Sequence, residues 1–274
     1  MMFLGCPNRC TDTVTFSGGS WSASFPLANL ADPAFSVVAR SSTDGTADTK
    51  IRMDLGSTRV LKAIALANHN LSSAAQWLVK LGTTSGGSDV YSGTLASWIV
   101  STVEAGLSTL GMEDADDPRE GMLALIVLPS FMGARHVTIE ISDTSNPDNY
   151  VQIGRVFVGG GFVPTFNAAY GLQDGWLDLS TTDRSESGAL WATERRRLRQ
   201  VRMVLEGLTL DEGDTLHEMQ RQLGKTGEVL YVPNMSDIGQ SQRYGFIGTM
   251  EEMSALEYPY FRRRKLPLVL TEKG

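Results

Sequence analysis

Short runs of alternating apolar and polar residues, separated by turn-forming clusters, make up most of the first 160 residues. Residues 13–16 and 21–25 alternate in this way, with Ser17-Gly18-Gly19-Ser20 between them. Such alternation places the apolar side chains on one face of a β-strand. Residues 60–67 and 123–128 are nearly continuously apolar, which is typical of central strands buried on both faces. The pattern predicts a mostly β protein built on an antiparallel sandwich.

A glycine-rich segment ending in proline, Gly159-Gly160-Gly161-Phe162-Val163-Pro164, predicts a domain boundary. Glycine makes the backbone flexible at this point, and proline cannot continue a β ladder. We therefore expect a first domain at residues 1–160 and a second at residues 161–274. In the second domain, residues 189–208 indicate either one long strand or a pair of strands.

One short helix is expected in the second domain, at residues 215–223. Leu216, Met219 and Leu223 fall on one face of such a helix, and Gly224 follows as a stop signal. The three acidic residues among 211–214, in front of it, interact favourably with the positive end of the helix dipole. The second domain is thus predicted to be a β sandwich with one short helix.

The charge balance argues against nucleic-acid binding. The formal net charge is -7, whereas binding to phosphates requires an excess of cations. Two basic runs, Arg195-Arg196-Arg197 and Arg262-Arg263-Arg264, have acidic neighbours that weaken their field. Because arginine forms bidentate pairs that fix orientation, we expect both runs in an interface between copies of the chain. Nucleic-acid contact is the alternative.

Metal ions and cofactors are not expected. Cys6 and Cys10 have no histidine nearby, so they indicate two reduced thiols, with a local disulfide as the alternative. The acidic cluster at residues 113–117 lacks the loop glycine and distal glutamate of an EF-hand. A solvated loop is the favoured interpretation of this cluster, and calcium coordination is the alternative.

Catalytic motifs are incomplete. Gly224-Lys225-Thr226 lacks the upstream glycine of a P-loop, because Met219 occupies that position. The three histidines are widely separated in sequence, unlike the ligands of zinc hydrolases, and no Gly-x-Ser-x-Gly elbow occurs. We therefore expect a protein that is not an enzyme. A polysaccharide-degrading enzyme, recognisable by two facing carboxylates, is a remaining alternative.

Three aromatic residues near predicted loop ends, Trp77, Tyr91 and Trp98, have two readings. Exposed, they would stack on a sugar ring as ligand-binding residues. Buried, they would belong to the core, as aromatic residues of sandwiches usually do.

The chain start is apolar for only a few residues and has no basic segment, so no secretory signal is expected. No apolar run approaches the roughly 20 residues that a transmembrane helix needs. We therefore expect no membrane-spanning segment.

The order of residues in the first domain resembles the discoidin-like (galactose-binding-like) jelly roll. The resemblance covers about 150 residues and implies a jelly-roll sandwich whose outer loops could meet a sugar or another protein. It rests on Ala28-Asn29-Leu30-Ala31-Asp32-Pro33, Ala39-Arg40-Ser41, Arg52-Met53-Asp54-Leu55-Gly56, residues 63–70, residues 136–141, Asn146-Pro147 and residues 153–159.

The second domain is similar to C-terminal domains of bacteriophage minor tail proteins, in which a tail-tube-like β sandwich with one packed helix builds a ring. The similarity lies in the order of residues 195–208, 215–223, 229–233, 245–248 and 266–272. It implies a virion structural protein of the tail tip, assembled in the host cytoplasm as a trimer or hexamer ring with other tail proteins as partners. The alternative is a lectin-like adsorption module that binds host surface glycan.

Overall fold

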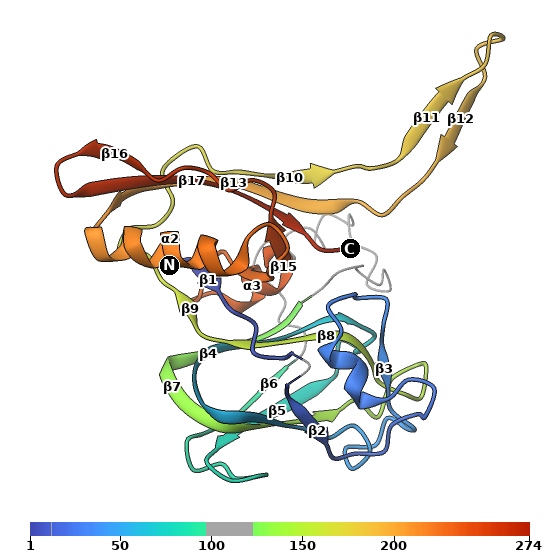
Figure 1. Ribbon diagram of the computed structural model, residues 1–274. Coiled ribbons are helices and arrows are strands. Elements are labelled where there is room, and N and C mark those ends of the chain that lie inside the picture. The colour runs from blue at the N-terminus through green and yellow to red at the C-terminus, as the bar shows by residue number, and fades with distance from the viewer. Residues whose placement is uncertain (12, 97–122) are drawn as a thin grey trace. The chain divides into compact units, whose positions relative to one another are not determined.

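The computed structural model describes residues 1–11, 13–96 and 123–274, which form two compact units (Figure 1). The first unit comprises Met1–Val163 and Leu230–Phe246, and the second comprises Pro164–Val229 and Ile247–Gly274. The predicted division at residue 160 differs from these units in one respect. Residues 230–246 pack with the first unit, although they follow most of the second unit in sequence.

Antiparallel strands make up most of the first unit, which confirms the prediction of a mostly β sandwich. One sheet has the strand order β3-β8-β4-β7-β5-β6, with β2 paired to β4, and β1 pairs separately with β9 and β14. The elements are β1 (Phe3–Gly5), β2 (Thr15–Ser17), the 3-10 helix η1 (Leu27–Ala31), β3 (Ala39–Arg40), β4 (Ile51–His69), β5 (Gln76–Gly82), β6 (Tyr91–Ala96), β7 (Leu123–Ser142), β8 (Gln152–Gly159), β9 (Gly161–Phe162), β14 (Val229–Val232) and α3 (Ile238–Tyr244).

Two long, bent strands allow a single hydrogen-bonded sheet to form both layers of the sandwich. The register between β4 and β7 shifts after Asp54 and again after Leu61. Gly56, with φ of 75°, lies within the first shift, and positive φ is a conformation that glycine adopts without steric cost. Before the bend β4 pairs with β2, and after it β4 pairs with β8. A bulge of this kind turns the strand direction and so folds the sheet onto itself.

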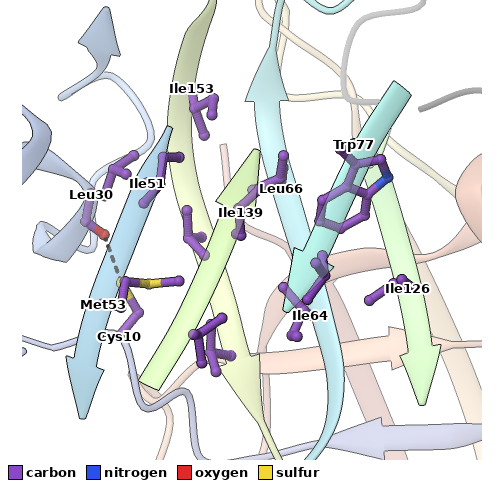
Figure 2. Packing of buried hydrophobic residues seen from close by; sticks show 14 of the residues in the cluster. Cys10, Leu30, Ile51, Met53, Ile64, Leu66, Trp77, Ile126, Ile139 and Ile153 are labelled. Atoms are coloured by element: carbon purple, nitrogen blue, oxygen red, sulfur yellow. Dashed lines mark hydrogen bonds between the residues drawn. The ribbon is translucent and has the colours of Figure 1, made fainter. Parts of the chain in front are cut away.

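The apolar core of the first unit lies between these layers. The predicted central strands are confirmed, since residues 61–67 of β4 are all buried and Leu123–Ile126 of β7 are buried as well. The indole of Trp77 lies inside this core near Ile64 and Ile126 (Figure 2).

The second unit is an antiparallel sheet with the order β10-β13-β17-β15, and β16 pairs with β17. A separate hairpin, β11 with β12, extends from the ends of β10 and β13 (Figure 1). The elements are β10 (Gln173–Leu177), β11 (Thr181–Arg184), β12 (Leu190–Thr193), β13 (Leu198–Leu208), α2 (Leu210–Leu223), β15 (Phe246–Met250), β16 (Glu257–Tyr260) and β17 (Arg263–Glu272). Of the two readings of residues 189–208, the structure has the pair of strands.

Helix α2 begins five positions before the predicted start at residue 215 and ends as predicted at Gly224. Thr209 and Glu212 form a capping box, in which each side chain accepts a hydrogen bond from the other residue's backbone N–H. The capping box satisfies the backbone N–H groups of Thr209 and Glu212, so the helix begins at Leu210. The short helix α3 lies outside the sequence prediction. Its N-cap is Asp237, whose carboxylate accepts from the backbone N–H of Gln240.

Candidate functional site

A stacked arginine marks one end of the first unit, where β3 ends and β8 begins. The Arg40 guanidinium lies between the rings of Phe25 and Tyr150, 4.6 Å and 4.3 Å from their centroids. Its Nη2 donates to Gln152 Oε1 at 2.7 Å, while its Nε is buried and has no hydrogen-bond partner among the described residues. All three stacked residues are half-buried, so one edge of the stack meets solvent. We call Phe25, Arg40 and Tyr150 the arginine stack.

A polar network holds the loops beside the arginine stack in place. The Asn70 side chain donates to Asp148 Oδ2 at 2.8 Å and to the Tyr150 carbonyl at 3.0 Å, and accepts from the Gln152 N–H at 2.7 Å. Asn146 donates to the Asn70 carbonyl at 2.9 Å. Because each loop is fixed by bonds to another loop, the stack presents a preorganised surface.

The network continues to a buried carboxylate. Asp143 accepts from the Asn146 amide at 2.8 Å, from the Ser72 N–H at 2.9 Å and from the Ser72 hydroxyl. Asp143 and Asn146 are almost fully buried. Buried polar groups of this kind are tolerated when each has a partner, so this part of the network is structural.

His69 lies at the end of β4, beside this network. Its Nδ1 accepts from the Leu71 N–H at 3.3 Å, and its Nε2 is enclosed without a hydrogen-bond partner among the described residues. Although the residue keeps some exposed surface, burial of the ring nitrogen lowers the pKa of His69 to about 4, and the nearby Asp143 carboxylate opposes this only in part. His69 is therefore neutral at physiological pH.

The structure corrects the ligand-binding prediction for Trp77. Its side chain is 0% exposed, because the alternation of β5 points Trp77, Val79 and Leu81 toward the core. Tyr91, at the start of β6, is partly buried against the same core. Trp98 and the acidic cluster at residues 113–117 lie outside the described residues. Neither Trp77 nor Tyr91 belongs to the arginine stack.

The stack itself escaped the sequence prediction. Its three residues come from a loop, from edge strand β3 and from the loop before β8, and no local spacing connects them. The register of β3 with β8, which pairs Arg40 with Gln152, brings them together. The sequence offered only Ala39-Arg40-Ser41 as a signal, within the resemblance to the discoidin-like fold.

The second unit carries most of the exposed large apolar side chains. Twelve of the fifteen such residues in the described chain belong to it. Leu190 and Trp191 on β12 are 59% and 71% exposed, and every residue of the hairpin 181–193 is exposed. We call residues 181–194 the arm. A two-stranded hairpin is marginal in water by itself, and exposed apolar side chains in such a hairpin indicate a surface that another molecule covers.

The two predicted arginine runs lie at opposite ends of the sheet in the second unit. Arg195, Arg196 and Arg197 follow the arm, whereas Arg262, Arg263 and Arg264 lie at the turn from β16 to β17.

Several of these arginines make contacts within the chain. Arg264 pairs with Asp214 and Arg196 lies 3.5 Å from Glu272, so both side chains have a partner within the chain. Arg263 donates to the Gly207 carbonyl at 2.8 Å, and exposed Arg197 lies 3.5 Å from Asp178. An interface role for the two arginine runs stays a prediction.

A buried ion pair at the root of the arm was also missed by sequence reasoning. Glu272 accepts from Arg199 Nε at 3.0 Å, from Arg199 Nη2 at 2.7 Å and from the Arg199 backbone N–H at 3.0 Å. Both residues are almost fully buried. The pair joins β13 to the end of β17 and fixes the strand from which the arm departs.

Cys6 and Cys10 are both free thiols. Burial raises the pKa of Cys6 to about 12, with Arg9 acting weakly in the opposite direction, and Cys10 Sγ donates to the Leu30 carbonyl at 3.3 Å. Within the described ranges, no group of three or more His, Cys, Asp or Glu side chains is arranged to hold a metal ion. No helix in those ranges is both long and apolar enough to cross a membrane.

No protein-family model matches the chain, and no curated protein matches it. Solved structures similar to it include the family 32 carbohydrate-binding module of Clostridium perfringens NanJ in complex with galactose. That structure has 13% identity and a TM-score of 0.37, with 58% of this chain and 98% of that chain covered. The lectin domain of lectinolysin, complexed with Lewis b antigen, has 14% identity and a TM-score of 0.38, with 57% and 97% covered. A C. perfringens module from a family 31 glycoside hydrolase has 12% identity and a TM-score of 0.36, with 54% and 94% covered.

Proposed function

We propose that this protein is a non-catalytic structural subunit that assembles with copies of itself through its second unit. The observation that carries the proposal is the arm, a hairpin with exposed Leu190 and Trp191. Burying such side chains in an interface stabilises the complex, and tryptophan is among the residues that contribute most to binding. An exposed arm without an assembly to enter would instead promote aggregation.

The sequence resemblance supports a finer form of the same proposal. Similarity to minor tail proteins suggests a ring of three or six copies at a bacteriophage tail tip, located in the virion and in contact with other tail proteins. The three solved structures named above are carbohydrate-binding or lectin domains, and none is a tail protein. The tail-tip assignment therefore rests on the sequence resemblance, and the proposal of self-assembly rests on the arm.

Deleting the arm tests this proposal. Ser180 and Arg195 already face each other at its root, where the Arg195 N–H donates to Ser180 Oγ at 2.9 Å. Joining these residues through two glycines in place of residues 181–194 should leave the sheet intact. We expect the full-length chain to form oligomers that dissociate on dilution, and the deletion variant to remain monomeric. Light scattering of the purified proteins across a concentration series measures both.

A matched control is Val60→Ser, which removes an exposed apolar side chain from the first unit. It should leave the mass unchanged. A full-length chain that is monomeric at every concentration would contradict the proposal.

Carbohydrate binding by the first unit is the second candidate function, and the arginine stack favours it. Aromatic rings and a guanidinium at a loop surface offer apolar faces for sugar C–H groups and donors for hydroxyl oxygens. The polar network around Asn70 preorganises this surface, which lowers the entropy cost of binding. Two of the similar solved structures are carbohydrate-binding proteins. The family 32 module is in complex with galactose, and the lectin domain of lectinolysin is in complex with Lewis b antigen.

Glycan-array screening of the full chain, followed by titration of any glycan that binds, tests this candidate. Arg40→Lys replaces the planar guanidinium with an ammonium that cannot stack between two rings. We expect it to weaken binding about tenfold, the equivalent of about 1.4 kcal/mol. Phe131→Ala, which removes an exposed aromatic ring from the bend of β7, should have no effect. An array without a bound glycan, or equal affinity in Arg40→Lys, would count against the stack as a sugar site.

A further inference from the structure

The arginine stack contains a positive charge with which no carboxylate of the described chain forms an ion pair. Nη2 of Arg40 donates to Gln152, a neutral amide, and Nε has no hydrogen-bond partner there. Asp148, the exposed carboxylate of the adjoining network, bonds to a side chain of that network instead. By contrast Arg264, which also lies beside an aromatic ring, pairs with Asp214. Arg40 is thus a half-buried cation without an anionic partner, an arrangement that costs free energy until an anion completes it.

The stacking limits the direction from which an anion can approach Arg40. The guanidinium lies between the rings of Phe25 and Tyr150, so its remaining donors are the N–H groups in its own plane. Nη1 has no hydrogen-bond partner in the described part of the chain and, unlike Nε, is not enclosed. A carboxylate can accept two parallel hydrogen bonds from the edge of a guanidinium, which a single hydroxyl oxygen cannot do. The free edge of Arg40 therefore fits a carboxylate better than a neutral sugar hydroxyl.

The charge of the whole chain makes the local cation decisive. The net charge of -7 repels an acidic ligand at long range, so general attraction does not favour such a ligand. At contact distance the two rings exclude water from the guanidinium, which strengthens its interaction with an anion. A preference for an acidic ligand would therefore originate at Arg40 itself.

We infer that the arginine stack binds a sugar that carries a carboxylate, with the carboxylate on Arg40 and the sugar ring against Phe25 and Tyr150. This inference rests on the proposed carbohydrate binding and names the chemical class of the sugar. Uronic acids and sialic acids share the required chemistry, because each has a carboxylate attached directly to a sugar ring. The bonds of Asn70 hold the loops in place, so the site is formed before the ligand arrives.

Matched sugars test the inference on the unaltered full-length chain. Galacturonic acid and its methyl ester, each as a methyl glycoside, share one ring, and only the acid is charged. N-acetylneuraminic acid and its methyl ester form the second pair, and methyl galactoside is the neutral reference. We expect one of the two acids to bind about tenfold more tightly than its own ester in isothermal titration calorimetry. Raising the salt concentration should reduce this difference, because salt screens the charges.

The outcomes separate the inference from the function on which it rests. The pair that shows the difference distinguishes a uronic acid from a sialic acid. If only uncharged sugars bind, or if neither acid binds more tightly than its ester, the inference is overturned and the proposed carbohydrate binding stands. If no sugar binds in the titrations or on the glycan array, both are overturned.

Two arginine variants locate the preference. Arg40→Gln removes the charge but keeps a planar amide, so we expect the acid to bind only about as tightly as its ester. Arg59→Gln makes the same change of charge at the exposed bend of β4, whereas the stack lies beside the far end of that strand. It should retain the difference of about tenfold. Circular dichroism shows whether both variants are folded. A preference that persists in folded Arg40→Gln would overturn the assignment to the stack.

Discussion

Replacing Glu272 with glutamine is expected to destabilise the second unit by about 3–5 kcal/mol, the cost of removing one partner from a buried ion pair. The Glu272 carboxylate accepts three hydrogen bonds from Arg199, and both side chains are almost fully buried. Glutamine keeps the size and one acceptor but removes the charge, so the buried Arg199 guanidinium loses its ion pair with this carboxylate. Urea unfolding and hydrogen exchange of β13 and β17 measure the loss.

Two further variants separate this cause from a general weakening of the sheet. Glu218→Gln acts on an exposed pair, Glu218 with Arg221, and should leave stability nearly unchanged because water screens such pairs. The double variant Arg199→Met with Glu272→Leu replaces both charges with apolar groups and should recover most of the loss. A loss below about 1 kcal/mol in Glu272→Gln would mean that solvent reaches the pair.

We expect the direction of the arm to depend on this pair at its root, which would link the stability of the second unit to its proposed assembly. Arg199 is the second residue of β13, and Trp176 of β10 is its partner in the register. If Glu272→Gln loosens this corner, the arm samples more directions and oligomers form less readily. A flexible arm loses conformational entropy when it binds, and this loss raises the dissociation constant of the oligomer.

The elements that sequence predicts best are those with strong periodicity. Residues 61–67 and 123–126 are buried central strands as expected, since a continuous apolar run has no face that tolerates water. Of the two readings of Trp77, the structure has the core one, because Trp77 is buried and alternates with Val79 and Leu81 along β5. The strand begins at Gln76, so Trp77 lies within the strand and not at a loop end.

Sites formed by strand register could not be predicted in the same way. The arginine stack and the Arg199–Glu272 pair each join residues that are distant in sequence and become neighbours only when particular strands pair. An alternating pattern indicates which face of a strand is buried, but it does not identify the distant strand with which that strand pairs. The early start of α2 is different, because the Thr209–Glu212 capping box is visible in the sequence as Thr-x-x-Glu.

The first unit is expected to lose stability when the pH falls below about 6.5, because of His69. Burial lowers the pKa of His69 from 6.5 to about 4 in the folded protein, while the unfolded chain keeps the ordinary value. Between these two values the unfolded chain binds a proton that the folded protein does not, so stability falls as the pH decreases. The stability that depends on a neutral His69 is fully present above the unfolded pKa of 6.5. It has been lost once the pH reaches the folded pKa of about 4.

The size of this effect follows from the two pKa values. Lowering the pH from about 7.5 to about 5 should reduce the free energy of unfolding of the first unit by about 2 kcal/mol. This range lies above the ordinary pKa of carboxylates, so the titration of aspartate and glutamate contributes little. His69→Asn provides the control, because its side-chain oxygen can accept the Leu71 N–H bond that Nδ1 accepts now, without titrating in this range. Urea unfolding at the two pH values should show a difference in the unsubstituted chain that is largely absent from His69→Asn. If both proteins respond equally to pH, another group is responsible, and the His69 imidazole is hydrated in solution.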